Sequence, residues 1–209
     1  MMKRTRDLLI TRHLLIYLLL GLVPLVTPVD YVVTYFLYIL LYGMLAIGLC
    51  LLMAYAGQIS VGHAAFFGIG AYVSGLLSIH YHIPFWAALP AAGVAAGVVG
   101  YLVGFPALRI KGLYLAVMTF AFGELVYVLM RGLDTWTGGP NGLIGIPRAE
   151  LAGYTFPTVQ AYYYLTLGVF VLVFVLAQNL VNSRVGRALR ALHGSEHGAT
   201  ALGIDVNRY

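Results

Sequence analysis

The chain has 209 residues, of which 61% are hydrophobic and only 9% are charged. A soluble domain carries about 25% charged residues, so the composition excludes a soluble protein and indicates an integral membrane protein. The net charge is +5. Basic residues of membrane proteins gather in cytoplasmic loops, so this charge does not indicate nucleic-acid binding. The single cysteine, Cys50, excludes an intrachain disulfide.

Two apolar runs follow a short basic start. The first, Leu14 to Val29, is compatible with a cleaved signal peptide or a membrane span. We favour a span, because Pro24 and Pro28 interrupt the run, no small-residue cleavage site follows and more apolar sequence comes at once. The second run, Tyr31 to Tyr55, has 25 residues, which is long enough to cross a bilayer at about 1.5 Å per residue.

A third apolar segment begins with a broken stretch, Gly57 to Tyr72, in which glycines and polar residues interrupt the apolar sequence. In hydrocarbon each unpaired backbone N–H or C=O costs several kcal/mol, so such a stretch is buried in protein or lines a wet cavity. Broken helices often mark the substrate path of membrane carriers. Gln58, Ser60 and His63 are therefore candidates to line that path. Alternatively, Ser60 caps the following helix and His63 ties one helix to another.

Three further spans are predicted. Phe85 to Gly104 is rich in Ala and Gly, which predicts a helix packed on both sides. Leu113 to Met130 contains one acid, Glu124, which is either part of the substrate path or a protonated carboxyl that joins helices. Ala161 to Val181 is the sixth span. We therefore expect an all-α polytopic transmembrane protein with about six spans and a broken third segment.

The basic residues predict the orientation of these spans. With the N-terminus in the cytoplasm, ten cations lie inside and two outside, which is a strong positive-inside bias. We expect residues 1–181 to form the membrane domain and residues 182–209 to form a cytoplasmic segment. The inside residues are Lys3, Arg4, Arg6, Arg12, Arg109, Lys111, Arg184, Arg187, Arg190 and Arg208, and the outside residues are Arg131 and Arg148.

The loop Arg131 to Gln160 is too long for a simple connector, which favours a functional role. Its tight turn suits an external gate or a docking surface for a binding protein, although a plain structured loop is the alternative. The turn consists of Gly139, Pro140, Asn141 and Gly142. No phosphate-binding loop of the Gly-x-x-x-x-Gly-Lys-Ser/Thr type and no metal-ligand spacing occurs, so we expect this chain to bind no cofactor and no metal.

Seven motifs follow one another along the chain: Tyr42 to Leu49, Ala54 to Tyr72, Leu108 to Ala116, Phe122 to Glu124, Thr137 to Leu143, Gly145 to Pro147 and Gly186 to Ala191. Together they resemble the permease subunits of branched-chain amino acid ABC importers. Of the two permease types in this family, the LivM type is the more similar. The resemblance covers roughly Leu41 to Tyr209. Family members continue into further spans after the point that corresponds to Tyr209, so we expect a fragment or a truncated product.

The resemblance implies a set of partners and a place in the cell. It implies a second permease subunit, two cytoplasmic ATPases that bind the ATP, an extracytoplasmic solute-binding protein and the cytoplasmic membrane of a bacterium or archaeon. A short helix that includes Glu196, Ala199 and Gly203 would dock onto an ATPase, with Arg187 in the motif before it. The spacing i, i+3, i+7 predicts that these three residues share one helix face. The alternative is an ordinary basic tail.

The expected function is therefore a permease subunit, not an enzyme, that moves branched-chain or related small amino acids by alternating access. The same resemblance extends to importers of urea and short amides, so the substrate stays open. One rival function is an ion- or proton-coupled secondary transporter with Glu124 as the coupling acid. Another is a nonconducting membrane scaffold. Co-purification with an ATPase pair separates the importer from both.

Overall fold

The computed structural model describes residues 16–27, 29–107, 110, 112–151 and 154–204. The described residues are mostly helical, with one antiparallel pair of two-residue strands, which confirms the all-α class. Arg109, Lys111, Arg208 and the N-terminal cations lie outside the described residues. After an apolar helix at Ile16–Val26, the elements are α2 (Asp30–Cys50), η1 (Leu51–Tyr55), α3 (His63–His80), α4 (Phe85–Ala107), α5 (Leu113–Gly132), α6 (Asp134–Thr137), η2 (Gly139–Asn141), β1 (Glu150–Leu151), β2 (Tyr154–Thr155), α7 (Val159–Asn182), α8 (Arg184–Gly194) and α9 (Glu196–Ala201).

Four helices of the described chain are long and apolar enough to cross a membrane, and each coincides with a predicted span. They are Asp30–Tyr55, Phe85–Ala107, Leu113–Gly132 and Val159–Asn182. The two other predicted spans also correspond to helices. Ile16–Val26 is a shorter apolar helix, and α3 has 18 residues with a histidine at each end. Each of the six predicted apolar segments therefore contains a helix where the sequence places one.

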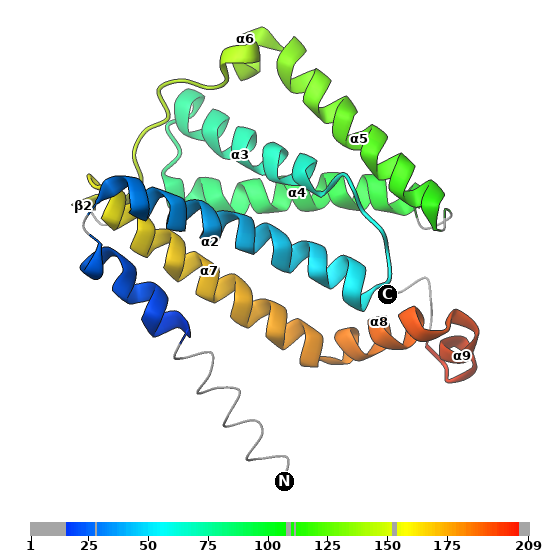
Figure 1. Ribbon diagram of the computed structural model, residues 1–209. Helices are drawn as coiled ribbons and strands as arrows, with labels where there is room; N and C mark the ends of the chain where they lie inside the picture. The colour runs from blue at the N-terminus through cyan, green and yellow to red at the C-terminus, as the bar shows by residue number, and fades with distance from the viewer. Residues whose placement is uncertain (1–15, 28, 108–109, 111, 152–153, 205–209) are drawn as a thin grey trace. The chain divides into compact units, whose positions relative to one another are not determined.

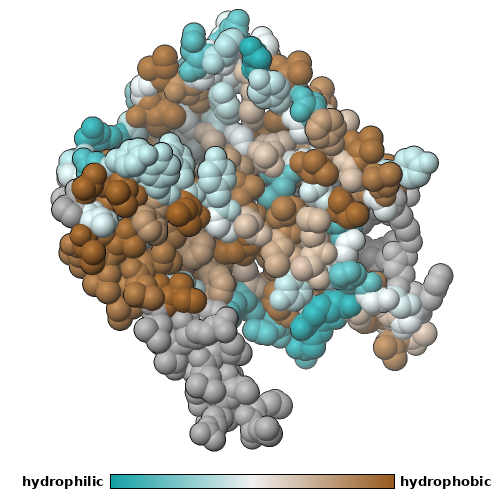
Figure 2. Space-filling view, viewed as in Figure 1, coloured by the Kyte–Doolittle hydropathy of each residue, from teal (hydrophilic) through white to brown (hydrophobic). Residues whose placement is uncertain are grey.

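The chain forms two compact units, each built from segments that are far apart in the sequence. The first unit combines the described parts of residues 1–47 and 157–179. Its core is Val33 and Leu40 of α2 with Tyr163 of α7. Figure 2 shows an apolar surface around the first helix and the adjoining parts of α2 and α7, whose places are seen in Figure 1. Exposed apolar side chains at this density suit contact with lipid.

A proline determines one contact inside this first unit. Pro24 has no N–H, so the Leu20 carbonyl lacks the helical donor that residue 24 would normally supply. The Tyr163 hydroxyl donates a hydrogen bond of 2.7 Å to that carbonyl. At another point of the unit, the Gln160 side-chain amide donates to Asp30 at 2.7 Å. These two bonds give α7 polar attachments to the first two helices.

The second unit combines residues 48–156 with the described part of 180–209, and α3 packs in it against both α4 and α5 (Figure 1). The start of α3 lies very close to α5. A Cβ atom at Gly62 would collide with the Thr119 carbonyl oxygen, and it would lie 3.6 Å from the Gly123 nitrogen. Glycine at position 62 therefore permits a backbone approach that any larger residue would prevent.

Helix α4 differs from its prediction. Ala88 and Ala92 are buried, but a Cβ added at Gly93 or Gly97 would have no described atom within 4 Å. The prediction that this helix is packed on both sides is therefore wrong for the described chain. Small residues allow a close helix contact, but they do not supply the neighbour that makes it. The expected division at residue 181 concerns the two sides of a membrane and stays a prediction.

Candidate functional site

The helical backbone is interrupted between Tyr55 and His63. The end of α2 passes into the π-helical turn η1, in which the Ala56 N–H donates to the Leu51 carbonyl at 3.2 Å. The Gln58 N–H then reaches back to the Leu52 carbonyl at 3.1 Å. Gly57 between them has a φ of +70°, a conformation that favours glycine. This break lies at the start of the predicted stretch Gly57 to Tyr72; from His63 onward that stretch is regular helix and forms the first part of α3.

A neighbouring helix satisfies part of the broken backbone. The Val61 N–H donates to the Thr119 hydroxyl oxygen at 3.0 Å, and that hydroxyl donates to the Ala116 carbonyl at 3.0 Å. Thr119 thus links the break to α5. Such a partner is what a non-helical segment at membrane depth requires.

A cavity of about 930 Å³ lies beside the break, within the second unit. This volume is at the upper end of the range of about 300–1,000 Å³ that is typical of ligand pockets. The walls are mostly apolar, with a few polar groups among them. The lining residues are Gly48, Leu51, Leu52, Ala56, Gly57, Gln58, Ile59, Ser60, His63, Phe66, Ala96, Gly100, Val103, Gly104, Ala107, Ile110, Gly112, Leu115, Thr119, Leu189, Leu192 and His193.

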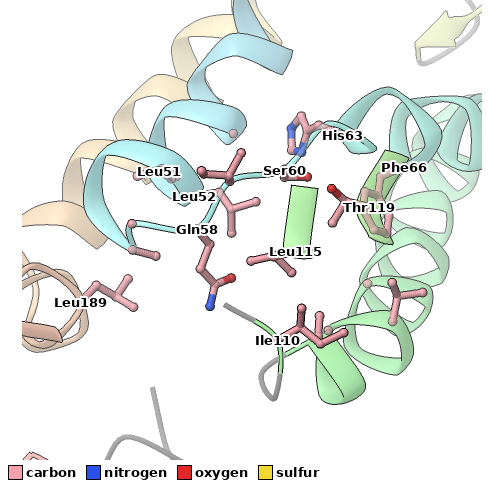
Figure 3. Close-up of a pocket in the computed structure, with 18 of the residues that line it drawn as sticks. Leu51, Leu52, Gln58, Ser60, His63, Phe66, Ile110, Leu115, Thr119 and Leu189 are labelled. Atoms are coloured by element: carbon pink, nitrogen blue, oxygen red, sulfur yellow. The ribbon is translucent and has the colours of Figure 1, made fainter. Parts of the chain in front are cut away.

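Three of the predicted site residues, Gln58, Ser60 and His63, line this cavity. Figure 3 shows the Gln58 amide reaching into the open space between Leu189 and Ile110, with Ser60 and His63 further along the same segment. Ser60 does not cap α3, because the N-cap residue is Gly62 and no side chain bonds there. A cavity with a few amide, hydroxyl and imidazole groups among mostly apolar walls suits a small molecule that has both polar and apolar parts.

His63 also joins one helix to another, as the alternative interpretation of this residue predicts. A Cβ atom at Gly48 would lie 2.8 Å from His63 Nε2, so the imidazole packs directly on the backbone of α2. Its ring centroid is 6.4 Å from that of Phe66. The side chain therefore joins α2 and α3 and borders the cavity at the same time.

The structure does not bring Glu124 to this cavity. Glu124 is exposed on α5, while Leu115 and Thr119 line the cavity. Glu124 follows Thr119 by five positions on the helix, which places the two side chains roughly 140° apart around the helix axis at about 100° per residue. Gln58 lines the cavity and Glu124 does not, so the cavity does not support the prediction that both lie on one substrate path.

The predicted outer turn is held by its own hydrogen bonds. The Thr137 hydroxyl donates to the Leu133 carbonyl at 2.9 Å and accepts the Gly139 N–H at 3.3 Å. Gly139 and Gly142 have φ values of +57° and +69°, so both positions favour glycine. Pro140 and Asn141 are exposed, and none of the four turn residues lines the cavity. A role as a gate or docking surface stays a prediction.

The predicted coupling segment contains two helices. Arg187 of α8 donates from Nη1 to the Asn182 carbonyl at 3.0 Å. Helix α9 ends at Ala201, so Gly203 lies beyond it, and Ala199 is only 2% exposed. The prediction that Glu196, Ala199 and Gly203 share one helix face is therefore wrong, because Gly203 is not in the helix. The Glu196 side chain lies outside the described part of the chain.

Gly203 instead terminates the helix. The Ile204 N–H donates to the Ala199 carbonyl at 3.0 Å and the Gly203 N–H donates to the Thr200 carbonyl at 2.9 Å. With a φ of +80° at Gly203, this is a Schellman motif, in which glycine adopts the left-handed conformation just after a helix. The sequence signal was a glycine directly after the helical run. The motif leaves Leu202 81% exposed.

Sequence reasoning missed Thr119 and three residues of α8, namely Leu189, Leu192 and His193, all of which line the cavity. A threonine within an apolar span was a usable signal for the first. No local pattern places α8 beside residues more than a hundred positions earlier. Among the described residues, no group of three His, Cys, Asp or Glu side chains is arranged to hold a metal ion.

Comparisons with known proteins agree with this architecture. A family model described as "Branched-chain amino acid transport system / permease component" matches residues 31–209. The chain is 33% identical over 192 residues to the high-affinity branched-chain amino acid transport system permease protein LivM of Escherichia coli (strain K12), covering 81% of this chain and 45% of that protein. The protein of the same name in Salmonella typhimurium (strain LT2) gives the same identity and coverage.

The chain thus spans about half the length of the curated relatives that it matches, at 45% of each. No solved structure matches the chain significantly. The family match covers far more than half of the sequence and includes the break, the cavity-lining helices and the segment after α7. With these apolar helices, the chain is an integral membrane protein that belongs to the branched-chain amino acid transport system permease family.

Proposed function

We propose that this chain is part of a permease subunit of an ATP-binding-cassette importer, and that it carries branched-chain or related small amino acids into the cell. The observation that carries the proposal is the cavity of about 930 Å³ at a broken membrane segment, in a chain that matches the permease family over residues 31–209. The chain itself catalyses no covalent step.

The cavity lining fits the chemistry of such a substrate. Gln58 and Ser60 offer neutral hydrogen-bonding groups to the ammonium and carboxylate of a zwitterion. Leu52 and Phe66 offer apolar surface to a branched side chain. Neutral donors and acceptors suit transport, because a substrate must leave the site as well as enter it.

ATP hydrolysis on partner subunits would drive the cycle. In this proposal two cytoplasmic ATPases engage the segment after α7, a second permease subunit completes the membrane pathway, and an extracytoplasmic binding protein delivers the substrate. The permeases of the named relatives are part of a "transport system", which supports partner subunits in general. Leu202, which is 81% exposed beside α9, offers an apolar side chain to such a partner. Closure of the ATPases would change the side of the membrane to which the cavity is open.

Uptake in proteoliposomes tests the proposal. The complete system that contains this permease is reconstituted with its ATPases and binding protein, and uptake of radiolabelled L-leucine is measured with ATP inside. We expect uptake that requires ATP and that unlabelled isoleucine and valine compete away. Uptake of urea or a short amide without uptake of leucine would contradict the proposed substrate.

A second condition addresses the proton-coupled alternative. An uncoupler is added to the same proteoliposomes while ATP is kept constant. An ATP-driven importer keeps its rate, whereas a proton-coupled carrier loses it. The family match favours the importer, and loss of uptake in the uncoupler would reverse that preference.

A further inference from the structure

Helix α8 makes three contacts with the break beside the cavity, and none of them is visible in the sequence. The π-helical turn η1 ends at Tyr55, so the last carbonyl groups of this helix have lost their helical donors. The Gln58 N–H, which would bond the Ala54 carbonyl in a continuous α-helix, goes to Leu52 instead. His193 Nδ1 lies 3.1 Å from the Ala54 carbonyl oxygen and donates to it. A side chain of α8 thus replaces the donor that the break removed.

The imidazole of His193 also packs on the backbone of the break. A Cβ atom at Gly57 would lie 2.6 Å from His193 Cδ2 and 3.0 Å from its Cγ. Gly57 has a φ of +70°. Glycine is required there both by the backbone conformation and by the histidine ring, so the two segments fit closely at this point.

Arg190 makes the third contact. Its guanidinium carbon lies 5.9 Å from the centroid of the Tyr55 ring, within cation–π range. The same guanidinium donates from Nη2 to the Val181 carbonyl at 3.2 Å and from Nε to the Gly186 carbonyl at 3.3 Å. Arg190 therefore connects the last residue of η1 to the backbone where α8 begins.

Helix α8 is also joined to α9 and to the cavity. Ser195 separates the two helices, and its hydroxyl accepts the Gly198 N–H at 3.1 Å as the N-cap of α9. Leu189 and Leu192 of α8 line the cavity together with Gln58. All these residues belong to the same compact unit of the chain. If α9 moves, the short helix α8 can therefore transmit that movement to the residues that line the cavity.

We propose that His193 and Arg190 are positioning residues that fix the backbone of Ala54 to Gly57 and thereby aim the Gln58 amide into the cavity. Through them α8 moves as one body with the break during the transport cycle. The inference rests on the proposed importer function and deepens it, because it names the residues that link the ATPase-facing segment to the substrate site.

Two substitutions at one position test the hydrogen bond. His193→Phe keeps a ring against Gly57 but removes the donor, whereas His193→Asn keeps a side-chain N–H near the position of Nδ1. In the reconstituted complete system we measure leucine transported per ATP hydrolysed. We expect a fall of about tenfold for His193→Phe, the factor that corresponds to about 1.4 kcal/mol, and substantial recovery for His193→Asn. Arg184→Met, a change of an exposed cation on the same helix, is the matched control and should leave the ratio unchanged.

A cross-link tests the movement as one body and does not depend on the histidine. Tyr55→Cys and Arg190→Cys are combined in a Cys50→Ser background, and the two thiols are joined with a short bifunctional reagent. The unlinked protein should transport less per ATP than the Cys50→Ser parent, and the link should restore the ratio. Inhibition by the link would show that the two segments separate during the cycle and would overturn the proposal. Equal ratios for His193→Phe and wild type would also overturn it.

The wild-type control separates this inference from the proposed function. If wild type shows no ATP-dependent uptake of any amino acid, the proposed function fails and the positioning role fails with it. If wild type transports and the variants match it, only the positioning role fails. Retention of the ATPases on each purified variant confirms that assembly is intact.

Discussion

At the scale of single residues, the polar side chains in the apolar segments have different surroundings. Thr119 bonds the broken backbone, and His63 packs on Gly48 while it borders the cavity. Glu124 is different, because it is exposed on a helix that is apolar enough to span a membrane and no described residue donates a hydrogen bond to it. A charged carboxylate is costly in hydrocarbon, so an acid at this place is a candidate for a functional role.

The change Glu124→Gln distinguishes these roles. It keeps a hydrogen-bonding side chain of the same size and removes any charge. Because Glu124 lies outside the cavity, we expect leucine uptake to remain within about twofold of wild type. Loss of uptake at normal membrane levels would mean that the carboxyl takes part in transport, either as a coupling acid or as a substrate contact.

Tyr163 gives a stability prediction at the same scale. Tyr163→Phe removes the donor to the Leu20 carbonyl, which Pro24 has left without a helical partner. We expect a loss of about 1–3 kcal/mol, which thermal unfolding in detergent can measure. In a Pro24→Ala background the helical donor is restored, so the same substitution should cost less. Equal costs in the two backgrounds would contradict this account.

At the scale of elements, helix ends matter more than helix interiors for this protein. The long apolar helices coincide with the runs in the sequence, because length and hydropathy suffice to specify a membrane-spanning helix. The features that build the site are ends: the π-helical turn at Leu51–Tyr55, the N-terminus of α3 and the Schellman motif after α9. Each depends on one glycine or one partner from another helix.

The end of α9 permits a sharper test of ATPase docking. Gly203→Arg and Gly203→Ala both introduce a Cβ atom at a φ of +80°, so both carry the same backbone strain. Only arginine adds a long charged side chain to the surface beside Leu202. If this surface docks an ATPase, the arginine variant should retain much less ATPase than the alanine variant on purification from membranes, with equal permease inserted. Equal retention would exclude the region around Gly203 from the contact.

At the scale of the whole molecule, the chain is a membrane protein that covers 45% of the length of its curated relatives. The family match extends from residue 31 to residue 209 and confirms the resemblance inferred from the motifs. The predicted orientation in the membrane rests on the cations, of which the six-span prediction places ten on one side and two on the other. We propose that the N-terminus is cytoplasmic and that the protein resides in the cytoplasmic membrane.

Reporter fusions test this orientation. A reporter that is active only outside the cytoplasm is fused after Gly145, and one that is active only inside is fused after Ser195. With a cytoplasmic N-terminus and six spans, both reporters should be active. Each reporter is also exchanged for the one that is active on the opposite side. If the exchanged reporter is active at either point and the original one is inactive in a stably inserted fusion, the six-span orientation is wrong.

The sequence by itself determined the membrane class, the positions of the helices, the break before α3 and the family. These properties depend on local composition and on motifs, because a bilayer imposes length and hydropathy on each span separately. The tertiary structure alone decided that α8 reaches the break, that Glu124 does not line the cavity and that Ala199 is buried. Such contacts join residues as far apart as Ala54 and His193. They depend on which helix faces pack together, and a single apolar sequence contains no period that fixes the neighbour of each face.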